Sequence, residues 1–338
     1  MIIHSKSPAR VDLAGGTLDI WPLYLFHENS QTVNFAIRCF AHCWLKPRQD
    51  GAIEFVSRDL KLRERYPSLD ALKKAKNFRL SLHARLTIEF APATGFTLET
   101  DSGVQAGSGL GGSSALNIAI CGTLARFLDL KLSPAKLIEV ARNVEAQVLQ
   151  IPAGEQDYYS AVFGGMQAIH LTPHGVQPEK IVVNADEFSS RSVLCYTGQS
   201  RNSGINNWEV FKARIDKKGG KEKVTRHFDR IAAIASDMRL ALETKDWEQV
   251  ASLLNQEWSA RKKNHPGIST PKMEQLISVA RRNGALAAKA CGAGGGGCIF
   301  FFVKPELKAV VETQLKNAGA ILLDSRMAPR GLTISKTA

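Results

Sequence analysis

The sequence contains few of the features that mark secreted, metal-binding or membrane proteins. Its six cysteines form no Cys-x-x-Cys pair and no array with histidines, which argues against a zinc site or a redox pair. No apolar run approaches the roughly 20 residues of a membrane helix, and the first residues lack the charged and apolar regions of a signal peptide. We therefore expect a cytoplasmic protein that does not attach to a membrane and whose cysteines are mostly buried thiols.

Length and charge narrow the class of protein. With 338 residues, the chain exceeds the about 250 to 300 residues that one hydrophobic core supports, so two domains, or one large α/β unit with an appendage, are expected. The formal net charge of +12 suits an anionic ligand, nucleic acid or simple solubility. No aromatic platform alternates with the densest basic run, residues 212–230, and we interpret that run as a solvated helix face.

The hydrophobic pattern changes along the chain. Its first part is rich in strands, and beyond about residue 200 long helices dominate. This shift predicts a domain boundary near residue 190. The expected strands are 2–7, 11–14, 32–37, 39–45, 53–57, 96–100, 166–171, 181–183, 192–197, 299–303, 321–324 and 332–334, and the expected helices are 69–75, 78–90, 116–128, 134–148, 207–215, 224–242, 247–263, 271–282 and 305–317.

The stretch Val104–Ala115 is a loop rich in glycine and serine that runs into an apolar helix. Its glycines let the backbone turn at positive φ and approach a ligand without an intervening Cβ. The free N–H groups and the positive dipole end of the helix attract phosphate. The stretch nevertheless matches neither G-x-x-x-x-G-K-[ST] nor a dinucleotide-type G-x-G-x-x-G. Taken alone, it leaves both phosphate binding and an ordinary loop open.

Four charged side chains accompany this loop. Arg10 and Asp19 flank a glycine turn, which indicates either a site wall or a hairpin with a surface ion pair. Glu145 lies at the edge of the apolar stripe of its helix, where it can face a cleft or solvent. Asp157 follows a glycine turn and precedes an apolar turn, a position typical of a helix N-cap or of a catalytic acid.

Three glycine-rich segments in this order resemble the motifs of the GHMP small-molecule kinases. They are Ser7–Gly16, Gly107–Ala115 and Lys289–Gly297. Further segments are similar to the sugar kinase branch that contains heptose 7-phosphate kinases and fucokinase-like enzymes; these are Gln156–Gly165, Tyr196–Gly198, Leu254–Trp258 and Pro266–Pro271. The resemblance covers nearly the whole chain.

The resemblance implies an α+β fold of two domains. Residues 1–190 would form an ATP-binding domain like ribosomal protein S5 domain 2, and residues 191–338 would form a ferredoxin-like domain. The implied activity is phosphoryl transfer from ATP, assisted by Mg²⁺, to a hydroxyl of a sugar or sugar phosphate. Such a protein needs no nucleic acid or membrane partner, and it would be a monomer or a homodimer.

The resemblance also implies roles for individual residues. Asp157 would accept or orient the proton of the substrate hydroxyl, and Arg10 would neutralise charge near the transferred group. Ser113 and Glu145 would hold Mg²⁺, and Ser114 would cap the helix. The ATP loop would comprise Gly107, Ser108, Gly109, Leu110, Gly111, Gly112, Ser113 and Ser114; the sugar would contact Gly16, Thr17, Asp19 and Asp157; and the third motif (Gly292, Gly294, Gly295 and Gly296) would order the site by packing and backbone contact.

The turn before Asp19 departs from the usual pattern. Relatives read Ala-Gly-Gly-Gly-Thr-Asp, whereas this chain reads Ala-Gly-Gly-Thr-Leu-Asp over residues 14–19, so the substrate is open. Trp21 can stack on a sugar or pack, and we favour packing. A phosphorylated acceptor would need additional cations in the pocket, such as Arg201 or Lys289.

Three alternatives remain at this stage. The first is a kinase of the same family that acts on a mevalonate-like or homoserine-like alcohol. The second is a non-catalytic sensor of sugar and ATP on the same fold, which the presence of all four proposed catalytic and metal-binding residues argues against. The third is a nucleic-acid-binding protein, which only the net charge suggests.

Overall fold

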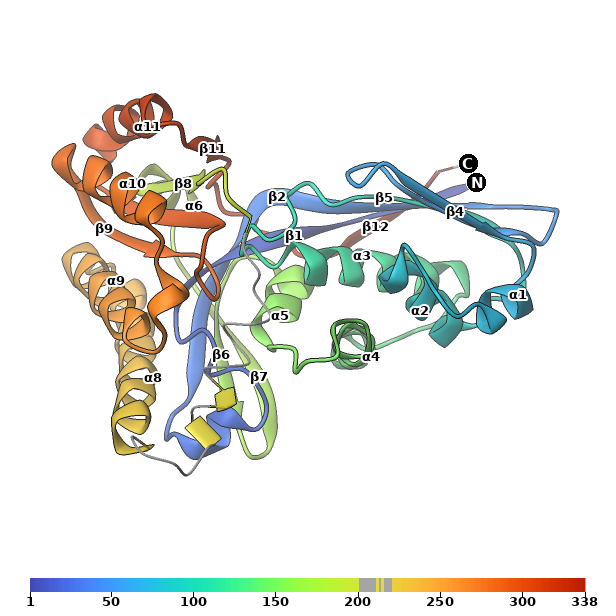
Figure 1. The fold of residues 1–338 in the computed structure, drawn as a ribbon, viewed down its shortest axis with the longest axis horizontal. Helices are drawn as coiled ribbons and strands as arrows, with labels where there is room; N and C mark the ends of the chain where they lie inside the picture. The colour runs from blue at the N-terminus through green and yellow to red at the C-terminus, as the bar shows by residue number, and fades with distance from the viewer. Residues whose placement is uncertain (201–210, 213, 216–220, 338) are drawn as a thin grey trace.

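The computed structural model describes residues 1–200, 211, 212, 214, 215 and 221–337. Figure 1 shows two sheets joined near the middle of the molecule, each with its own set of helices. Helices and strands are mixed in both parts, which confirms the prediction of an α+β fold with two domains. Among the described helices, none is both long and apolar enough to cross a lipid bilayer.

The larger sheet is organised around one long strand, β2 (Gln31–Pro47), which pairs with β1 along its length. The first part of β2 pairs with β6 and its last part pairs with β5, so the sheet divides into two arms. The strand order is β12-β1-β2-β5-β3-β4, with β6 and β7 attached to β2. The other strands are β1 (Ile2–Ala14), β3 (Ile53–Ser57), β4 (Leu62–Tyr66), β5 (Phe96–Asp101), β6 (Met166–Thr172), β7 (Gly175–Ile181) and β12 (Thr333–Thr337).

Helices α2 to α5 lie on one side of this sheet (Figure 1). The central helix, α3, is buried on most of its surface, and all of its residues from Ser114 to Ala125 except Leu116 are buried. The hydroxyl of Ser5 on β1 donates a hydrogen bond to Ala119 O of this helix at 2.7 Å. α4 begins at Pro134 with Ser133 as its cap. The helices of this part are α1 (Leu69–Lys74), α2 (Ser81–Phe90), α3 (Gly112–Phe127), α4 (Pro134–Leu149) and α5 (Gln156–Phe163), with the 3-10 turn η1 (Leu23–Phe26).

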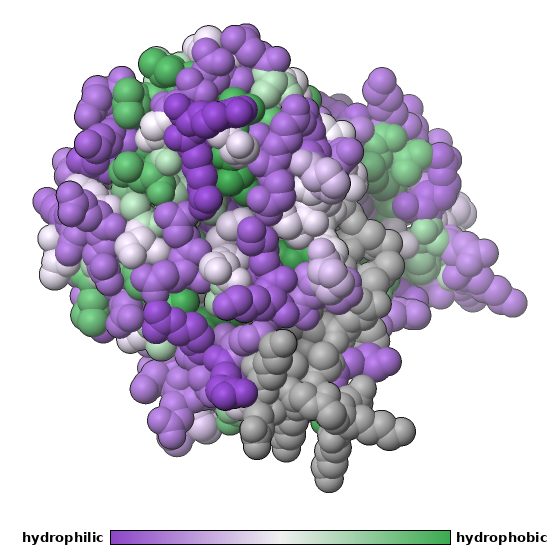
Figure 2. All heavy atoms as spheres, turned by 60° about the vertical axis from the view of Figure 1, so that its left-hand side comes forward, coloured by the Kyte–Doolittle hydropathy of each residue, from purple (hydrophilic) through white to green (hydrophobic). Residues whose placement is uncertain are grey.

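The smaller sheet has the order β11-β8-β10-β9 and is antiparallel throughout. Side chains of β10 alternate between two cores: Phe300 and Phe302 face the core shared with α8 and α9, and Phe301 faces α10 and α11. Its strands are β8 (Ser192–Tyr196), β9 (Ala285–Ala290), β10 (Cys298–Val303) and β11 (Ile321–Leu323), and its helices are α6 (Ala185–Ser190), α8 (Lys221–Thr244), α9 (Trp247–Lys262), α10 (Pro271–Arg282) and α11 (Lys308–Asn317), with the 3-10 turns η2 (Pro266–Ile268) and η3 (Pro305–Leu307). Hydrophilic side chains cover most of the face in Figure 2, with hydrophobic residues scattered among them.

Several sequence expectations need correction. The segment around Pro8 is one continuous strand, because Pro8 pairs with Phe40 at an irregularity of the ladder rather than ending it. Strand β4 and helix α6 were not expected, and the predicted helix 207–215 lies largely outside the described residues. The boundary at residue 190 stays a prediction; β8 is the first strand of the smaller sheet, and β12 returns to pair with β1.

Candidate active site

The glycine-rich loop reaches the N-terminus of α3 through a left-handed residue. Gly111 is the N-cap of α3, with φ +68°. A Cβ at this position would lie 3.0 Å from Asp157 Oδ2, so both the turn and the close approach of the acid require glycine. The prediction that Ser114 caps the helix is therefore wrong: Ser114 lies inside the first turn, buried, with its hydroxyl bonded to Glu145.

Glu145 reaches the same end of α3 from α4. Its Oε2 accepts hydrogen bonds from Tyr158 Oη at 2.6 Å and from Ser114 Oγ at 3.0 Å. Burial raises the pKa of Glu145, and hydrogen bonds from Tyr158, Ser113 and Ser114 oppose that shift. Glu145 is thus a buried carboxylate that faces hydroxyl groups, and its solvent-facing alternative is excluded.

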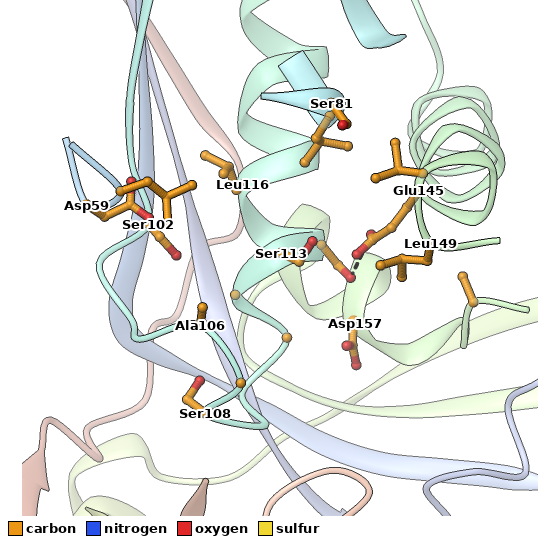
Figure 3. A pocket seen from close by; sticks show the side chains of 18 of the residues that line it. Asp59, Ser81, Ser102, Ala106, Ser108, Ser113, Leu116, Glu145, Leu149 and Asp157 are labelled. Atoms are coloured by element: carbon orange, nitrogen blue, oxygen red, sulfur yellow. Dashed lines mark hydrogen bonds between the residues drawn. The ribbon is translucent and has the colours of Figure 1, made fainter. Parts of the chain in front are cut away.

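A cavity of about 540 Å³ opens beside these residues. Figure 3 shows Ser113, Glu145 and Asp157 projecting toward it from α3, α4 and α5. The loop 105–109 forms one wall, and residues 79–83 and 148–154 form much of the rest. The volume lies in the range of small-molecule sites.

Arg10 on β1 fixes the acid at the start of α5. Its Nε and Nη2 donate to Asp157 Oδ1 at 2.8 and 2.6 Å, and its Nη1 donates to Gly109 O at 2.8 Å. Arg10 is buried, whereas the side chain of Asp157 is 23% exposed. The arginine therefore holds, through Oδ1, a carboxylate that lines the cavity.

A second, smaller cavity of about 70 Å³ is also lined by Asp157. Asp157 and Gly154 line both cavities, while Asp12, Thr17 and Asp19 line only the smaller one. Asp157 consequently stands where the two cavities adjoin.

Asp19 is held at the smaller cavity by the start of α5. Its Oδ2 accepts a hydrogen bond from Gln156 N at 3.1 Å. Burial, with a smaller contribution from the negative charge of Asp157, raises the pKa of Asp19 to about 7. The surface ion pair between Arg10 and Asp19, the alternative that the sequence left open, is not the arrangement found: Arg10 pairs with Asp157.

The third glycine segment, between β9 and β10, contacts the loop directly. Cys298 N donates to Ser108 O at 2.7 Å, and a Cβ on Gly297 would lie 2.5 Å from the same oxygen. Gly292 also lines the smaller cavity. The contact is made by backbone atoms, as the sequence predicted for this segment.

The sequence analysis missed a cluster of buried ions behind the smaller cavity. Lys289 Nζ lies 3.3 Å from Asp12 Oδ2 and 3.3 Å from Glu257 Oε2, and Arg261 is bonded to Glu257 and lies 3.5 Å from Asp12 Oδ2. Lys289 is fully buried and already paired with two carboxylates, so the suggestion that it serves a substrate phosphate is wrong. Arg201, the other suggested cation, lies outside the described residues. Glu257 and Arg261 stand four residues apart on a helix, which was an available signal.

The turn around Asp19 brings one further correction. Trp21 is 63% exposed, so the prediction that it packs is wrong. Ile20 is buried and its backbone forms a bridge with Gly154, whereas the side chain of Trp21 lies at the surface.

The chain is similar to known kinases. Residues 72–165 match the family model of the GHMP kinases N terminal domain, and residues 238–321 match that of the GHMP kinases C terminal. The chain is 31% identical to a D-glycero-alpha-D-manno-heptose 7-phosphate kinase of Campylobacter jejuni, over 98% of each chain. The chain belongs to the GHMP kinases. It is therefore a small-molecule kinase, as the motifs indicated.

Other GHMP kinases extend the comparison. A mevalonate kinase of Thermococcus gammatolerans is 27% identical over 99% of each chain. The crystal structure of a D-glycero-D-manno-heptose 1-phosphate kinase from Bacteroides thetaiotaomicron matches with a TM-score of 0.80 over 99% of each chain, at 24% identity. This match confirms the two-domain GHMP kinase fold.

Removing the charge of Lys289 should destabilise the protein strongly. In Lys289→Met the free energy of unfolding should fall by about 3–5 kcal/mol, because Asp12 and Glu257 lose a buried counterion. The exposed pair Lys136–Glu139 provides the control, since Lys136→Met should unfold close to the wild type. Urea denaturation checks both variants, and equal losses in the two would show that the cluster does not need this charge.

Asp19 should make stability depend on pH. Between its ordinary value of 3.8 and its folded pKa of about 7, the folded chain keeps a proton that the unfolded chain releases, so stability falls as pH rises through this window. Asp19→Asn should remove this dependence. Relative to the variant, the wild type should lose roughly 2 kcal/mol between about pH 5 and pH 7. Urea unfolding at both pH values measures it, and parallel losses in the two proteins would contradict the assignment.

Proposed function

We propose that the chain transfers the γ-phosphoryl group of ATP to a hydroxyl of a sugar or sugar phosphate, with the help of Mg²⁺. The observation that supports this best is the position of Asp157, which lines both cavities and is held by Arg10. A phosphoryl donor in one cavity and an acceptor in the other would meet at this acid. Phosphoryl transfer depends mainly on such positioning and on charge neutralisation.

The larger cavity is the proposed ATP site. Its wall is the loop 105–114, whose backbone N–H groups stand at the N-terminus of α3. A helix N-terminus presents unpaired donors and a positive dipole end to phosphate. The contact of Cys298 N with Ser108 O would keep the loop closed around the phosphates.

Ser113 and Glu145 are the proposed Mg²⁺ ligands. Mg²⁺ prefers hard oxygen donors such as carboxylates, and Glu145 is a buried carboxylate with the Ser113 hydroxyl beside it at the cavity. The donor set therefore fits the ion. When bound, Mg²⁺ would neutralise the charge of the phosphate oxygens.

The smaller cavity is the proposed acceptor site. Asp157 would accept the proton of the attacking hydroxyl, and Arg10 would hold the carboxylate in place and offset developing negative charge. Asp19, with its pKa of about 7, carries a proton in part of the molecules near neutral pH and can both donate and accept hydrogen bonds to sugar hydroxyls. The polar wall of Asp12, Thr17 and Asp19 suits a polyhydroxyl acceptor.

The relatives set the order in which acceptors should be tested. The Campylobacter jejuni relative is a kinase of D-glycero-alpha-D-manno-heptose 7-phosphate, so this compound comes first, followed by free hexoses and heptoses. Mevalonate tests the alternative raised by the archaeal relatives.

A panel of acceptors with ATP and Mg²⁺ tests the proposal directly. We expect ADP release with a heptose, hexose or sugar phosphate, and none with mevalonate or homoserine. The readout is coupled ADP detection, paired with thermal shift measurements on the same panel. Stabilisation by ligands without any turnover would show a sensor and refute the enzyme assignment of this site.

Asp157→Asn should reduce kcat by about 10² or more, because the amide cannot accept the proton of the hydroxyl. ATP should still bind with an affinity close to that of the wild type, since the loop is unchanged. The control is Asp129→Asn, whose side chain is 89% exposed and which should keep full activity. Steady-state kinetics and nucleotide titration check both variants, and a near-normal kcat in Asp157→Asn would exclude the proposed role.

A further inference from the structure

The acceptor turn adopts a backbone conformation that its sequence does not favour. Thr17 has φ +76°, in the left-handed region that β-branched residues rarely occupy. The turn lies between Ala14, at the end of β1, and Asp19. Local preferences of the chain would not hold it in this shape, so contacts from elsewhere must do so.

Arg261 of α9 supplies such contacts. Its Nη1 donates to Thr17 Oγ1 at 3.3 Å, and its Nη2 donates to Gly16 O at 3.1 Å. The side chain is 3% exposed and belongs to the C-terminal part of the chain, whereas the turn belongs to the N-terminal part. One guanidinium thus bonds both the side chain and the backbone of the turn.

The buried ion cluster keeps Arg261 from moving. Its Nε donates to Glu257 Oε1 at 2.8 Å, and Asp12 lies beside its Nη2. Lys289 bridges the same two carboxylates. Displacement of any side chain of this cluster would leave a buried charge without its counterion. The guanidinium of Arg261 is therefore held in place where it contacts the turn.

We propose that Arg261 is a positioning residue for the phosphoryl acceptor: it holds the turn 15–19 in the conformation that forms the acceptor cavity. This inference rests on the proposed acceptor role of that cavity. Gly16, Thr17 and Asp19 line the smaller cavity, and none of them lines the larger one. Loss of the guanidinium contacts therefore affects the binding of the acceptor and leaves the binding of ATP unchanged.

Arg261→Lys tests the proposal because it keeps the buried positive charge but cannot reproduce the planar fork of donors. With D-glycero-D-manno-heptose 7-phosphate as acceptor, KM for the acceptor should rise about tenfold, the usual effect of losing hydrogen bonds to a charged group. KM for ATP should stay within about twofold. Thr17→Val, which replaces the hydroxyl that Arg261 contacts by a methyl group, should also raise KM for the acceptor, and Thr17→Ser, which keeps the hydroxyl, should leave it close to the wild-type value.

Hydrogen exchange gives a readout that does not need turnover. In Arg261→Lys, amides of residues 15–20 should exchange faster, and amides of residues 105–115 should exchange as in the wild type. The matched control is Arg281→Lys, an exposed arginine on α10 bonded to Asn255, which should change neither exchange nor KM.

The outcomes separate the two proposals. Absence of turnover by the wild type with every acceptor refutes the proposed function, and unchanged exchange at residues 15–20 refutes the role of Arg261 independently. An unchanged acceptor KM in both Arg261→Lys and Thr17→Val also overturns the inference. So does an equal rise in both KM values together with lower stability, because that pattern indicates a purely structural role.

Discussion

One buried arginine fixes the glycine loop and the neighbouring acid relative to each other. Arg10 donates its backbone N–H to Leu110 O and its guanidinium N–H groups to Gly109 O and Asp157. Strand β1, the loop before α3 and the start of α5 therefore meet at a single side chain. Because a guanidinium is planar and stays charged at any pH the protein meets, Arg10 keeps its donors whatever the pH. Arg10 thus holds Asp157 at the place where the two cavities adjoin.

The smaller cavity gathers carboxylates, and the structure stabilises each one differently. Asp157 is paired with Arg10, and Asp12 is paired with Arg261 and Lys289 behind the cavity wall. Within the part of the chain that the structure describes, no buried cation is hydrogen-bonded to Asp19, and below its raised pKa of about 7 a proton takes the place of a counterion. Arg261 and Lys289 thus stand behind the acids, and the wall presents carboxylate oxygens together with the guanidinium of Arg10. Such a wall is suited to hydroxyl groups, which donate hydrogen bonds to carboxylates.

The parts of the molecule that depend on local sequence were predictable. Serine or threonine followed by proline marks the starts of α4 and α10, and both begin where the pattern indicated. The loop before α3 was recognisable from its glycines and from its order with the other two motifs. The contacts of Ser114 and Lys289 could not be predicted, because their partners are distant in sequence. Ser114 is bonded to Glu145, and Lys289 is paired with Asp12. No local pattern reports whether a lysine faces a ligand or a buried carboxylate.

The two halves of the proposed site differ in the same way, since one depends on a local stretch of sequence and the other on residues far apart in the sequence. The phosphate-binding part of the proposed nucleotide half consists of backbone groups at one loop and one helix end, and the side chains of Ser113 and Glu145 join them at the cavity. The proposed acceptor half is lined by residues of β1, of the turn that follows β1, of α5 and of the third glycine segment. Arg261 of α9 and Lys289 of β9 contact Thr17 and Asp12 in this lining. Apart from Arg10 and Asp157, which also contact the loop or line the larger cavity, a change in these side chains alters the acceptor cavity and leaves the loop residues as they are. If these proposed roles hold, one fold can keep its phosphoryl donor while its acceptor changes, and in this chain the contact of Arg261 with Thr17 belongs to the acceptor half.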